Sequence, residues 1–292
     1  MTAKKKILIT GYSSELMQHL VAHIDIEQYE ISGLLRSKSK IKVMDFNIIE
    51  GDLSNYSLMN KIVSGYDIII HAAGITHSFK SKPYFKINYN HTKNLVDTAQ
   101  KNNIERFIYI SSRAAGKKSG AYGKSKYLAE EYVKEKLDNW LIFRPSEVFG
   151  SNKKEGVEKL IHDAISKKWM LYPMGVKSKL FPIHIEDLAS IMAKNIFDKK
   201  LSSRTIIING SKGYTNKELI LKVCALINKK ILIIPIPKIV MYTTKLILEV
   251  IPFQIGIVPD QIPRLYSNKE YTKVDHQMLE IEDYIIWKGY NQ

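Results

Sequence analysis

The chain has 292 residues, one cysteine and a net charge of +15, because 44 lysines and arginines face 29 aspartates and glutamates. A hydrophobic content of 45% argues against disorder, and a single cysteine excludes a disulfide-stapled secreted module. The lysines are spread along the chain without a recognisable nucleic-acid-binding motif, so no nucleic-acid partner is expected. No apolar run reaches the roughly 18 residues of a membrane span, and the run after the first lysines is too short for a signal peptide. We therefore expect a cytoplasmic protein without a transmembrane segment.

Short β-branched segments alternate with helical patterns through the first half of the chain. This alternation is typical of βαβ units and predicts an α/β fold of the Rossmann type, with a doubly wound parallel sheet. The predicted strands cover residues 6–10, 30–35, 47–50, 67–71, 106–111 and 140–143. Ligands of such sheets bind outside the carboxyl ends of the strands, so functional residues are expected directly after each strand.

The pattern loosens after residue 145, where helices are predicted near 154–168, 186–197 and 215–228 and strands near 205–209 and 231–234. We therefore expect a dinucleotide-binding domain over residues 1–150. Residues 151–292 should form mainly a smaller C-terminal α/β lobe that binds the substrate, with some segments returning to the sheet.

One apolar helical segment, residues 239–251, lies within the proline-punctuated stretch 231–263 and allows two interpretations. The helix either packs on the lobe or lies on a membrane surface. Lys245 and Glu249 fall four residues apart on one polar face, which favours packing on the lobe.

The turn after the first strand, residues 10–17, reads TGYSSELM. A dinucleotide fingerprint has glycines in place of Ser14 and Met17, because glycines permit a tight turn and a close approach of the helix to the sheet. Met17 is therefore expected to push the helix away from the sheet, and Glu15 adds a carboxylate near the phosphate position. The other groups can still meet a phosphate at a helix N-terminus. Cofactor contacts are expected from Gly11, Tyr12, Ser13 and Ser14.

Basic residues follow the second strand. Arg36 stands where an NAD-binding chain carries an acidic residue for the ribose 2′-hydroxyl, and Lys38 and Lys40 come shortly after it. A guanidinium can make charge-assisted bidentate bonds to a 2′-phosphate. The pattern therefore favours NADP over NAD, and a solvated basic turn is the alternative.

A candidate catalytic group follows the strand predicted at 106–111. Ser112 comes directly after this strand, and Tyr122 and Lys126 lie four residues apart on one face of the next helix. An ammonium beside a phenol favours the phenolate, so Lys126 would tune Tyr122 as a proton donor and acceptor. Ser112 would hydrogen-bond the reacting carbonyl or hydroxyl. We expect these three residues to be catalytic.

Further motifs appear in order over residues 5–200. They are Thr10-Gly11, Gly51-Asp52-Leu53, His71-Ala72-Ala73-Gly74, Asn88, Ser111-Ser112, Tyr122 to Lys126, Arg144-Pro145, Val148-Phe149-Gly150 and Pro182 to Ala189. In these motifs the chain resembles the extended short-chain dehydrogenases/reductases of the NAD-dependent epimerase/dehydratase family. The resemblance implies a nicotinamide cofactor, here NADP or alternatively NAD, and a nucleotide-sugar substrate.

The resemblance also implies roles for residues in these motifs. Asp52 and Leu53 would flank the adenine, and Lys126 would serve both the ribose and Tyr122. Asn88 would support the site. Further cofactor contacts are implied for Ala72, Ala73 and Gly74, and nicotinamide contacts for Pro145 and Val148.

The motifs indicate an oxidoreductase or epimerase that transfers hydride reversibly at a carbinol or ketone carbon of the sugar, with net reduction favoured by the indicated NADP. A 4,6-dehydratase is not expected, because Arg113-Ala114-Ala115 stand where such enzymes carry an acidic pair. The loop from Arg113 to Gly120 either meets the diphosphate of the substrate or is solvated. Substrate contacts are expected from His77 and Arg264, no metal is expected, and the assembly is a monomer or a homodimer.

Two alternatives stay open. The altered turn at residues 11–17 is compatible with a non-catalytic scaffold that keeps the fold and binds cofactor poorly. The apolar stretch 231–263 and the positive charge are compatible with peripheral membrane contact, in a membrane-surface reductase of a lipid-like substrate.

Overall fold

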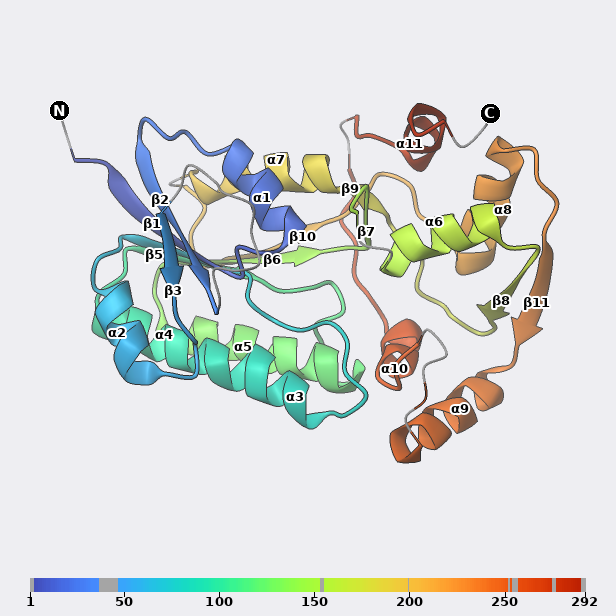
Figure 1. The fold of residues 1–292 in the computed structure, drawn as a ribbon, viewed down its shortest axis with the longest axis horizontal. Coiled ribbons are helices and arrows are strands. Elements are labelled where there is room, and N and C mark those ends of the chain that lie inside the picture. The colour runs from blue at the N-terminus through green and yellow to red at the C-terminus, as the bar shows by residue number, and fades with distance from the viewer. Residues whose placement is uncertain are drawn as a thin grey trace.

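The computed structural model describes residues 3–36, 47–152, 155–198, 200–251, 253, 257–274 and 277–289. Seven parallel strands form its central sheet in the order β10-β6-β5-β4-β1-β2-β3 (Figure 1). The strands are β1 Lys5–Thr10, β2 Tyr29–Leu35, β3 Asn47–Glu50, β4 Ile68–His71, β5 Arg106–Ile110, β6 Trp140–Pro145 and β10 Arg204–Ile208. This sheet confirms the predicted Rossmann-type fold.

Helices cover both faces of the sheet, as the apolar pattern of the strands requires. Successive side chains of a strand point to opposite faces, so Ile7 and Ile9 enter one core while Leu8 enters the other. The helices that pack with Ile7 and Ile9 are α1 Glu15–Ala22 and α7 Ile185–Ile196. The helices on the opposite face are α2 Tyr56–Val63, α4 His91–Lys101 and α5 Gly120–Lys136. Figure 1 shows these two helical layers on either side of the sheet.

The strand register brings the ends of neighbouring strands to one edge. Thr10, the last residue of β1, pairs with Leu34 of β2 on one side and with His71 of β4 on the other. Loops that leave these strands therefore start side by side. A short connection with α3 Lys82–Tyr84 and a π-helical turn, Phe85–Asn90, leads from β4 into α4.

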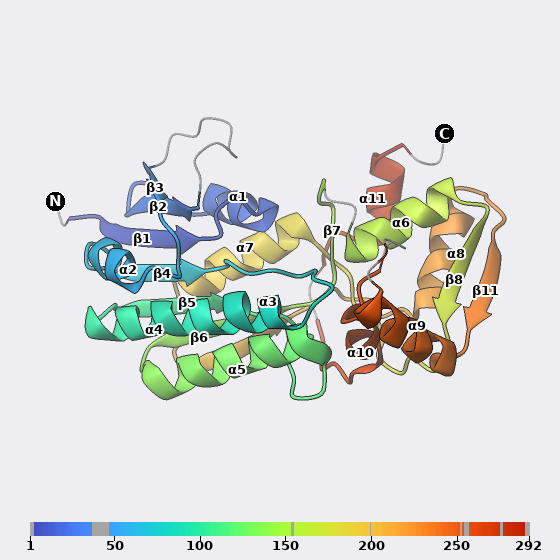
Figure 2. The ribbon, with the colours of Figure 1, turned by 60° about the horizontal axis from the view of Figure 1, so that its bottom comes forward.

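A smaller lobe lies at the end of the molecule remote from the N-terminus (Figure 2). Its helices are α6 Gly156–Ser166, α8 Asn216–Leu226, α9 Lys238–Val250, α10 Gln261–Tyr266 and α11 Ile281–Trp287. Its strands form two parallel pairs, β7 Val148–Phe149 with β9 Ile183–His184, and β8 Trp169–Pro173 with β11 Leu232–Ile236. None of the helices in the described part of the chain is long and apolar enough to cross a bilayer.

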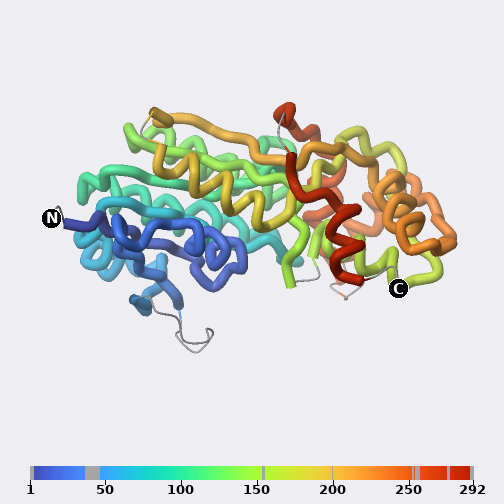
Figure 3. Tube along the Cα trace, turned by 90° about the horizontal axis from the view of Figure 1, so that it is seen from above, coloured from blue at the N-terminus to red at the C-terminus, as the bar shows by residue number. Residues whose placement is uncertain are grey.

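The chain crosses between the lobe and the sheet more than once. After β9 it enters α7 and β10, and β10 pairs with β6 as the outermost strand of the large sheet. Figure 3 shows this segment running back along the sheet before the chain returns to the lobe. The region 151–292 therefore supplies both lobe elements and sheet elements.

A buried ion cluster joins the two parts. Glu147, between β6 and β7, pairs with Arg113 at 2.7 Å and with Lys269 at 3.1 Å. Burial alone would raise the pKa of Glu147, but the charges of Lys269 and Arg113 lower it overall. The three side chains are at most one fifth exposed, so the cluster fixes the C-terminal segment around residue 269 against the sheet domain.

Candidate active site

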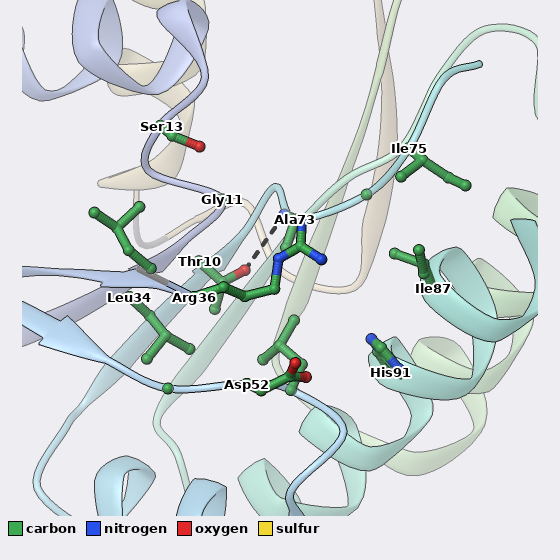
Figure 4. A pocket seen from close by; sticks show the side chains of 14 residues that line it. Thr10, Gly11, Ser13, Leu34, Arg36, Asp52, Ala73, Ile75, Ile87 and His91 are labelled. Carbon is green, nitrogen blue, oxygen red and sulfur yellow. Dashed lines mark hydrogen bonds between the residues drawn. The ribbon is translucent and has the colours of Figure 1, made fainter. Parts of the chain in front are cut away.

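A pocket of about 140 Å³ opens at the carboxyl edge of strands β1 to β4, where the sequence predicts the dinucleotide. Figure 4 shows the side chains that line it. They belong to Thr10, Gly11, Ser13, Leu34, Leu35, Arg36, Gly51, Asp52, Leu53, Ala73, Gly74, Ile75, Ile87 and His91. The pocket brings together the predicted cofactor contacts Gly11, Ser13, Arg36, Asp52, Leu53, Ala73 and Gly74.

Gly11 is required by the backbone at the start of this pocket. Its φ of +71° is one that side chains rarely adopt, and a Cβ here would lie 2.6 Å from the Ala73 nitrogen. Gly74 is similarly close to other groups, since a Cβ would lie 3.0 Å from Asn88 Oδ1 and 3.5 Å from Lys126 Nζ. Because neither glycine has a side chain, a dinucleotide could approach the main chain closely at this edge of the sheet. The residues present therefore fit a nicotinamide dinucleotide.

The remainder of the altered turn forms the start of α1. Ser14 is the N-cap of α1, and its side chain accepts a hydrogen bond from the Met17 nitrogen at 3.4 Å. The Met17 side chain is fully buried in the core that α1 shares with β1. The methionine therefore fills the interface between α1 and β1, and the expected displacement of the helix from the sheet stays a prediction.

Two other residues of the turn are engaged within the protein. The Tyr12 side chain is fully buried, and its ring lies so close to Gly33 that a Cβ there would be 2.8 Å away. The Glu15 carboxylate accepts hydrogen bonds from the main-chain and side-chain nitrogens of Asn152, at 3.0 and 2.7 Å. Tyr12 and Ser14 do not line the pocket, so their predicted cofactor contacts would come from the main chain.

Three titratable side chains line the pocket from three different elements, as Figure 4 shows. Arg36 follows β2, Asp52 follows β3 and His91 begins α4. Hydrogen bonds from Ser54 lower the pKa of Asp52, with smaller contributions from His91 and Arg36. Burial lowers the pKa of His91. Lys38 and Lys40, which the prediction placed behind Arg36, lie outside the described residues.

A buried histidine, His71, connects the elements that form this edge of the sheet. His71 Nδ1 lies 2.6 Å from Thr10 Oγ1, and His71 Nε2 lies 2.8 Å from Thr92 Oγ1. Burial lowers the pKa of His71 to about 3, so the ring is neutral at physiological pH. The histidine thus links β1, β4 and α4 through two hydrogen bonds without carrying a charge.

Asn88 shapes the loop that leaves β4. The π-helical turn at Phe85–Asn90 directs its side chain inward, where it is fully buried. Its Oδ1 accepts from the Ile75 nitrogen at 2.8 Å, and its Nδ2 donates to the Ile75 carbonyl at 3.0 Å. Both main-chain groups of Ile75 are therefore fixed, which holds this part of the pocket wall. The implied supporting role of Asn88 is consistent with this geometry.

The candidate catalytic residues come from the end of β5 and the first two turns of α5. Lys126 is buried, and its Nζ donates to the Ile110 carbonyl at 2.8 Å and lies 4.7 Å from the centre of the Tyr109 ring. Burial lowers the pKa of Lys126 to about 8. Ser112 is half-buried, and its Oγ accepts from the Ala114 nitrogen at 3.1 Å.

The lobe closes over Tyr122. The Arg264 guanidinium lies 4.4 Å from the centre of the Tyr122 ring, and Tyr84 meets the ring edge-on at 6.1 Å. Asp260 accepts hydrogen bonds from the main-chain nitrogens of Ala121 and Tyr122 and pairs with Arg264 at 3.2 Å. Tyr122 is consequently only 7% exposed.

His77, the other predicted substrate contact, lies beside the same part of the lobe. Its Nε2 is 3.0 Å from Gln261 Nε2, and its Nδ1 is 3.5 Å from Glu155. Burial lowers its pKa. Arg264 donates to the carbonyl of Thr76, the residue before His77, at 3.0 Å. The structure therefore brings Arg264 into contact with both Tyr122 and the residue before His77.

The predicted nicotinamide contacts lie at the end of β6. Pro145 is buried, and its carbonyl accepts from the Arg113 nitrogen at 2.9 Å, so the ends of β5 and β6 are tied together. Val148 is half-buried in β7. The Arg113 side chain is buried against Glu147, so within the loop Arg113–Gly120 it is not available to a substrate diphosphate, and a contact from the rest of the loop stays a prediction. Lys117 and Lys118 of the same loop are exposed.

Several pocket residues were missed from the sequence. His91 had a usable signal, because it lies three residues after Asn88 on a continuing helix and so faces a similar direction. Ile75 and Ile87 are apolar residues within a loop and a helical turn, and nothing in their local pattern separates them from core residues.

The comparisons with known proteins agree with this geometry. The chain belongs to the NAD dependent epimerase/dehydratase family, whose model matches residues 7–196. The mitochondrial 40 kDa subunit of NADH-ubiquinone oxidoreductase from Neurospora crassa is 25% identical over 173 residues, which are 59% of this chain and 45% of that protein. The chain spans about half the length of the first relatives that it matches.

Solved structures share the fold over most of the chain. WbmG from Bordetella bronchiseptica, in complex with NAD and UDP, has a TM-score of 0.71 at 14% identity, covering 99% of this chain and 96% of that one. The dTDP-4-dehydrorhamnose reductase from Bacillus anthracis, in complex with NADP, has a TM-score of 0.64 at 20% identity, covering 90% of this chain and 99% of that one. These likenesses extend the shared fold into the lobe.

Proposed function

We propose that the protein is an NADP-dependent oxidoreductase that reduces a ketone carbon of a nucleoside diphosphate sugar. One observation carries the proposal: buried Lys126 and Tyr122 lie on successive turns of α5, and Lys126 Nζ lies near Gly74 of the dinucleotide pocket. We therefore infer that the Tyr122 phenol transfers the proton next to the edge at which a nicotinamide cofactor would lie.

The residues present support a division of roles. Gly11, Ser13, Arg36 and Asp52 would hold the dinucleotide, which when bound supplies hydride chemistry. Tyr122 would donate its hydroxyl proton to the oxygen of the reduced carbonyl, and Ser112 would orient that oxygen by a hydrogen bond. Lys126, held by the Ile110 carbonyl, would keep a positive charge beside the phenol and favour its ionised form.

Arg36 supports the preference for NADP. Its guanidinium enters the pocket at the end of β2, where the adenosine ribose of a dinucleotide lies in this fold. The B. anthracis reductase of similar fold was solved with NADP, while WbmG was solved with NAD. We therefore expect NADPH to bind at least about tenfold more tightly than NADH, the discrimination that one charge-assisted pair supplies.

The first test is a titration of the protein with NADPH and NADH, followed by nicotinamide fluorescence. Tight NADPH binding that Arg36→Ala reduces to the level of NADH supports the proposal. Binding of neither cofactor contradicts it and favours the non-catalytic scaffold.

The second test is turnover with a nucleoside diphosphate 4-keto-6-deoxyhexose and C4-deuterated NADPH. Net NADPH consumption with deuterium in the sugar supports reduction, whereas a changed configuration without NADPH consumption indicates an epimerase. Tyr122→Phe should lower the rate by at least about 100-fold. Tyr127→Phe is the matched control, because Tyr127 lies on the same helix and bonds only to Glu131 at its hydroxyl.

A further inference from the structure

The helix α9 carries its apolar residues on the outside. Leu248 is its single buried side chain, while Ile239 is 71% and Val250 is 79% exposed. We define the outer face of α9 as Ile239, Val240, Leu246, Ile247 and Val250, all of them exposed. At 3.6 residues per turn these positions fall within an arc of about 120°. The helix packs on the lobe through Leu248 and through the contact of Tyr242 with Tyr266, but most of its apolar residues face outward.

No polar group on this arc needs a partner from outside. Thr243 falls in the middle of the arc, and its hydroxyl donates to the Val240 carbonyl at 2.9 Å. Thr244, at the margin, donates to the same carbonyl at 2.9 Å. The charged residues Lys245 and Glu249 lie outside the arc and pair with each other at 2.7 Å. A hydrocarbon phase can therefore cover the outer face without leaving a buried donor unsatisfied.

A second exposed apolar strip lies at the same end of the molecule. The outer surface of the β8–β11 pair carries Trp169, Leu171, Leu232 and Ile234, each at least 39% exposed. Pro237 alone separates β11 from α9, and Figure 2 shows α9 beside the two strands. Two exposed lysines, Lys168 and Lys230, precede these strands. Lysines and a tryptophan next to exposed aliphatic residues are typical of proteins that bind anionic membrane surfaces.

An apolar pocket opens between the β8–β11 strip and the inner side of α9. Its volume is about 480 Å³, and its lining includes Trp169 and Leu171 of the exposed strip, Met241 of α9 and Gln261 of α10. Gln261 also contacts His77. The pocket therefore adds apolar surface at the lobe end of the molecule, on the inner side of α9.

We propose that the outer face of α9 docks on an anionic phospholipid bilayer. At 13 residues α9 is too short to span the bilayer, so it lies in the interface. A second copy of this chain is a poorer occupant, because two chains of net charge +15 would bring their lysines together. The inference goes beyond the proposed reaction and depends on the lobe surface alone.

The test is flotation of the whole protein with phosphatidylcholine vesicles, with and without phosphatidylglycerol, at low and high salt. We expect binding to the anionic vesicles that weakens as salt increases. The double variant Ile247→Glu/Val250→Glu should weaken binding by at least about tenfold, since it removes two exposed apolar side chains from the interface. Lys168→Gln/Lys230→Gln should weaken binding and flatten its salt dependence.

Ile26→Glu is the matched control, because Ile26 is 56% exposed in the sheet domain, and it should bind vesicles like the wild type. The urea midpoint and NADPH affinity of each variant report whether it is folded. Absence of wild-type flotation at low salt overturns the proposal, as does flotation unaffected by the α9 variant. A wild-type dimer that this variant converts to a monomer, without vesicle binding, would assign the face to self-association. Failure of NADPH binding with intact flotation would contradict only the proposed reaction.

Discussion

At the scale of single residues, burial determines the charge of Lys126. Its pKa of about 8 means that the ammonium is lost as pH rises through the range where surface lysines stay charged. Turnover that depends on this ammonium should therefore fall above pH 8. The measurement is kcat/KM between about pH 6 and 10. Lys126→Arg should be slower but should lose this alkaline limb, because a guanidinium does not titrate there; the same limb in the variant would contradict the assignment.

His71 should make the protein less stable in acid. The unfolded histidine, with a pKa near 6.5, takes up a proton that the folded one, with a pKa of about 3, does not. The contribution of neutral His71 to the free energy of unfolding is therefore complete above pH 6.5 and is lost as pH falls toward 3. Between pH 7 and 5 this loss amounts to about 2 kcal/mol. Urea unfolding at both pH values should show it in the wild type and in His162→Asn but not in His71→Asn, and an unchanged loss in His71→Asn would refute the explanation.

Residue identity at the site was partly predictable. Spacing on a helix placed Tyr122 and Lys126 on one face, and the position after a strand placed Arg36 and Asp52 at the pocket. Sequence spacing could not reveal that Arg264, 142 positions after Tyr122, covers its ring. That contact depends on how the lobe folds back on α5, which no local pattern encodes.

At the scale of elements, α1 depends on a methionine where a dinucleotide fingerprint has glycine. Because the Met17 side chain is fully buried, Met17→Gly should lose about 3–5 kcal/mol from the cavity and the lower helix propensity. Ser14→Gly should lose only a few tenths of a kcal/mol, since glycine is nearly as good an N-cap as serine. Urea unfolding of both variants checks this; a Met17→Gly variant as stable as wild type would show that the core does not need the side chain.

Element boundaries in the sheet were predictable because hydrophobic alternation and strand length agree there. The predicted strand at 30–35 appears as β2 Tyr29–Leu35, and the one at 47–50 appears as β3 with the same limits. The π-helical turn at Phe85–Asn90 was not predictable. Its hydrogen bonds span one residue more than those of an α-helix, and this difference does not change the amino-acid composition of the segment. Helical periodicity also identified α9 as amphipathic but could not say which side faces solvent.

At the scale of the whole molecule, the Arg113–Glu147–Lys269 cluster joins the lobe to the sheet. Glu147→Gln would leave two cations buried without a counter-charge, so we expect a loss of about 3–5 kcal/mol. Glu131→Gln, which removes an exposed pair with Lys134, should lose no more than about 1 kcal/mol. Thermal unfolding compares the two, and equal losses would show that the cluster is not a junction.

The division of the chain was only partly visible in the sequence. The strand near 205–209 was predicted, but its place at the edge of the large sheet, beside β6, arises from a long-range return of the chain. Strand propensity indicates that a segment is extended but does not identify the strands with which it pairs.

The pairing of β11 with β8 has a consequence for solubility. The Leu232 nitrogen donates to Lys168, and N–H groups alternate in direction along a strand, so Ile233 and Pro235 face the open edge of β11. Exposed edges of apolar strands recruit strands from other molecules and seed aggregates. Proline has no N–H, so Pro235 removes a donor from that edge. The strand that exposes Leu232 and Ile234 is thereby protected from edge-to-edge association when the protein is concentrated.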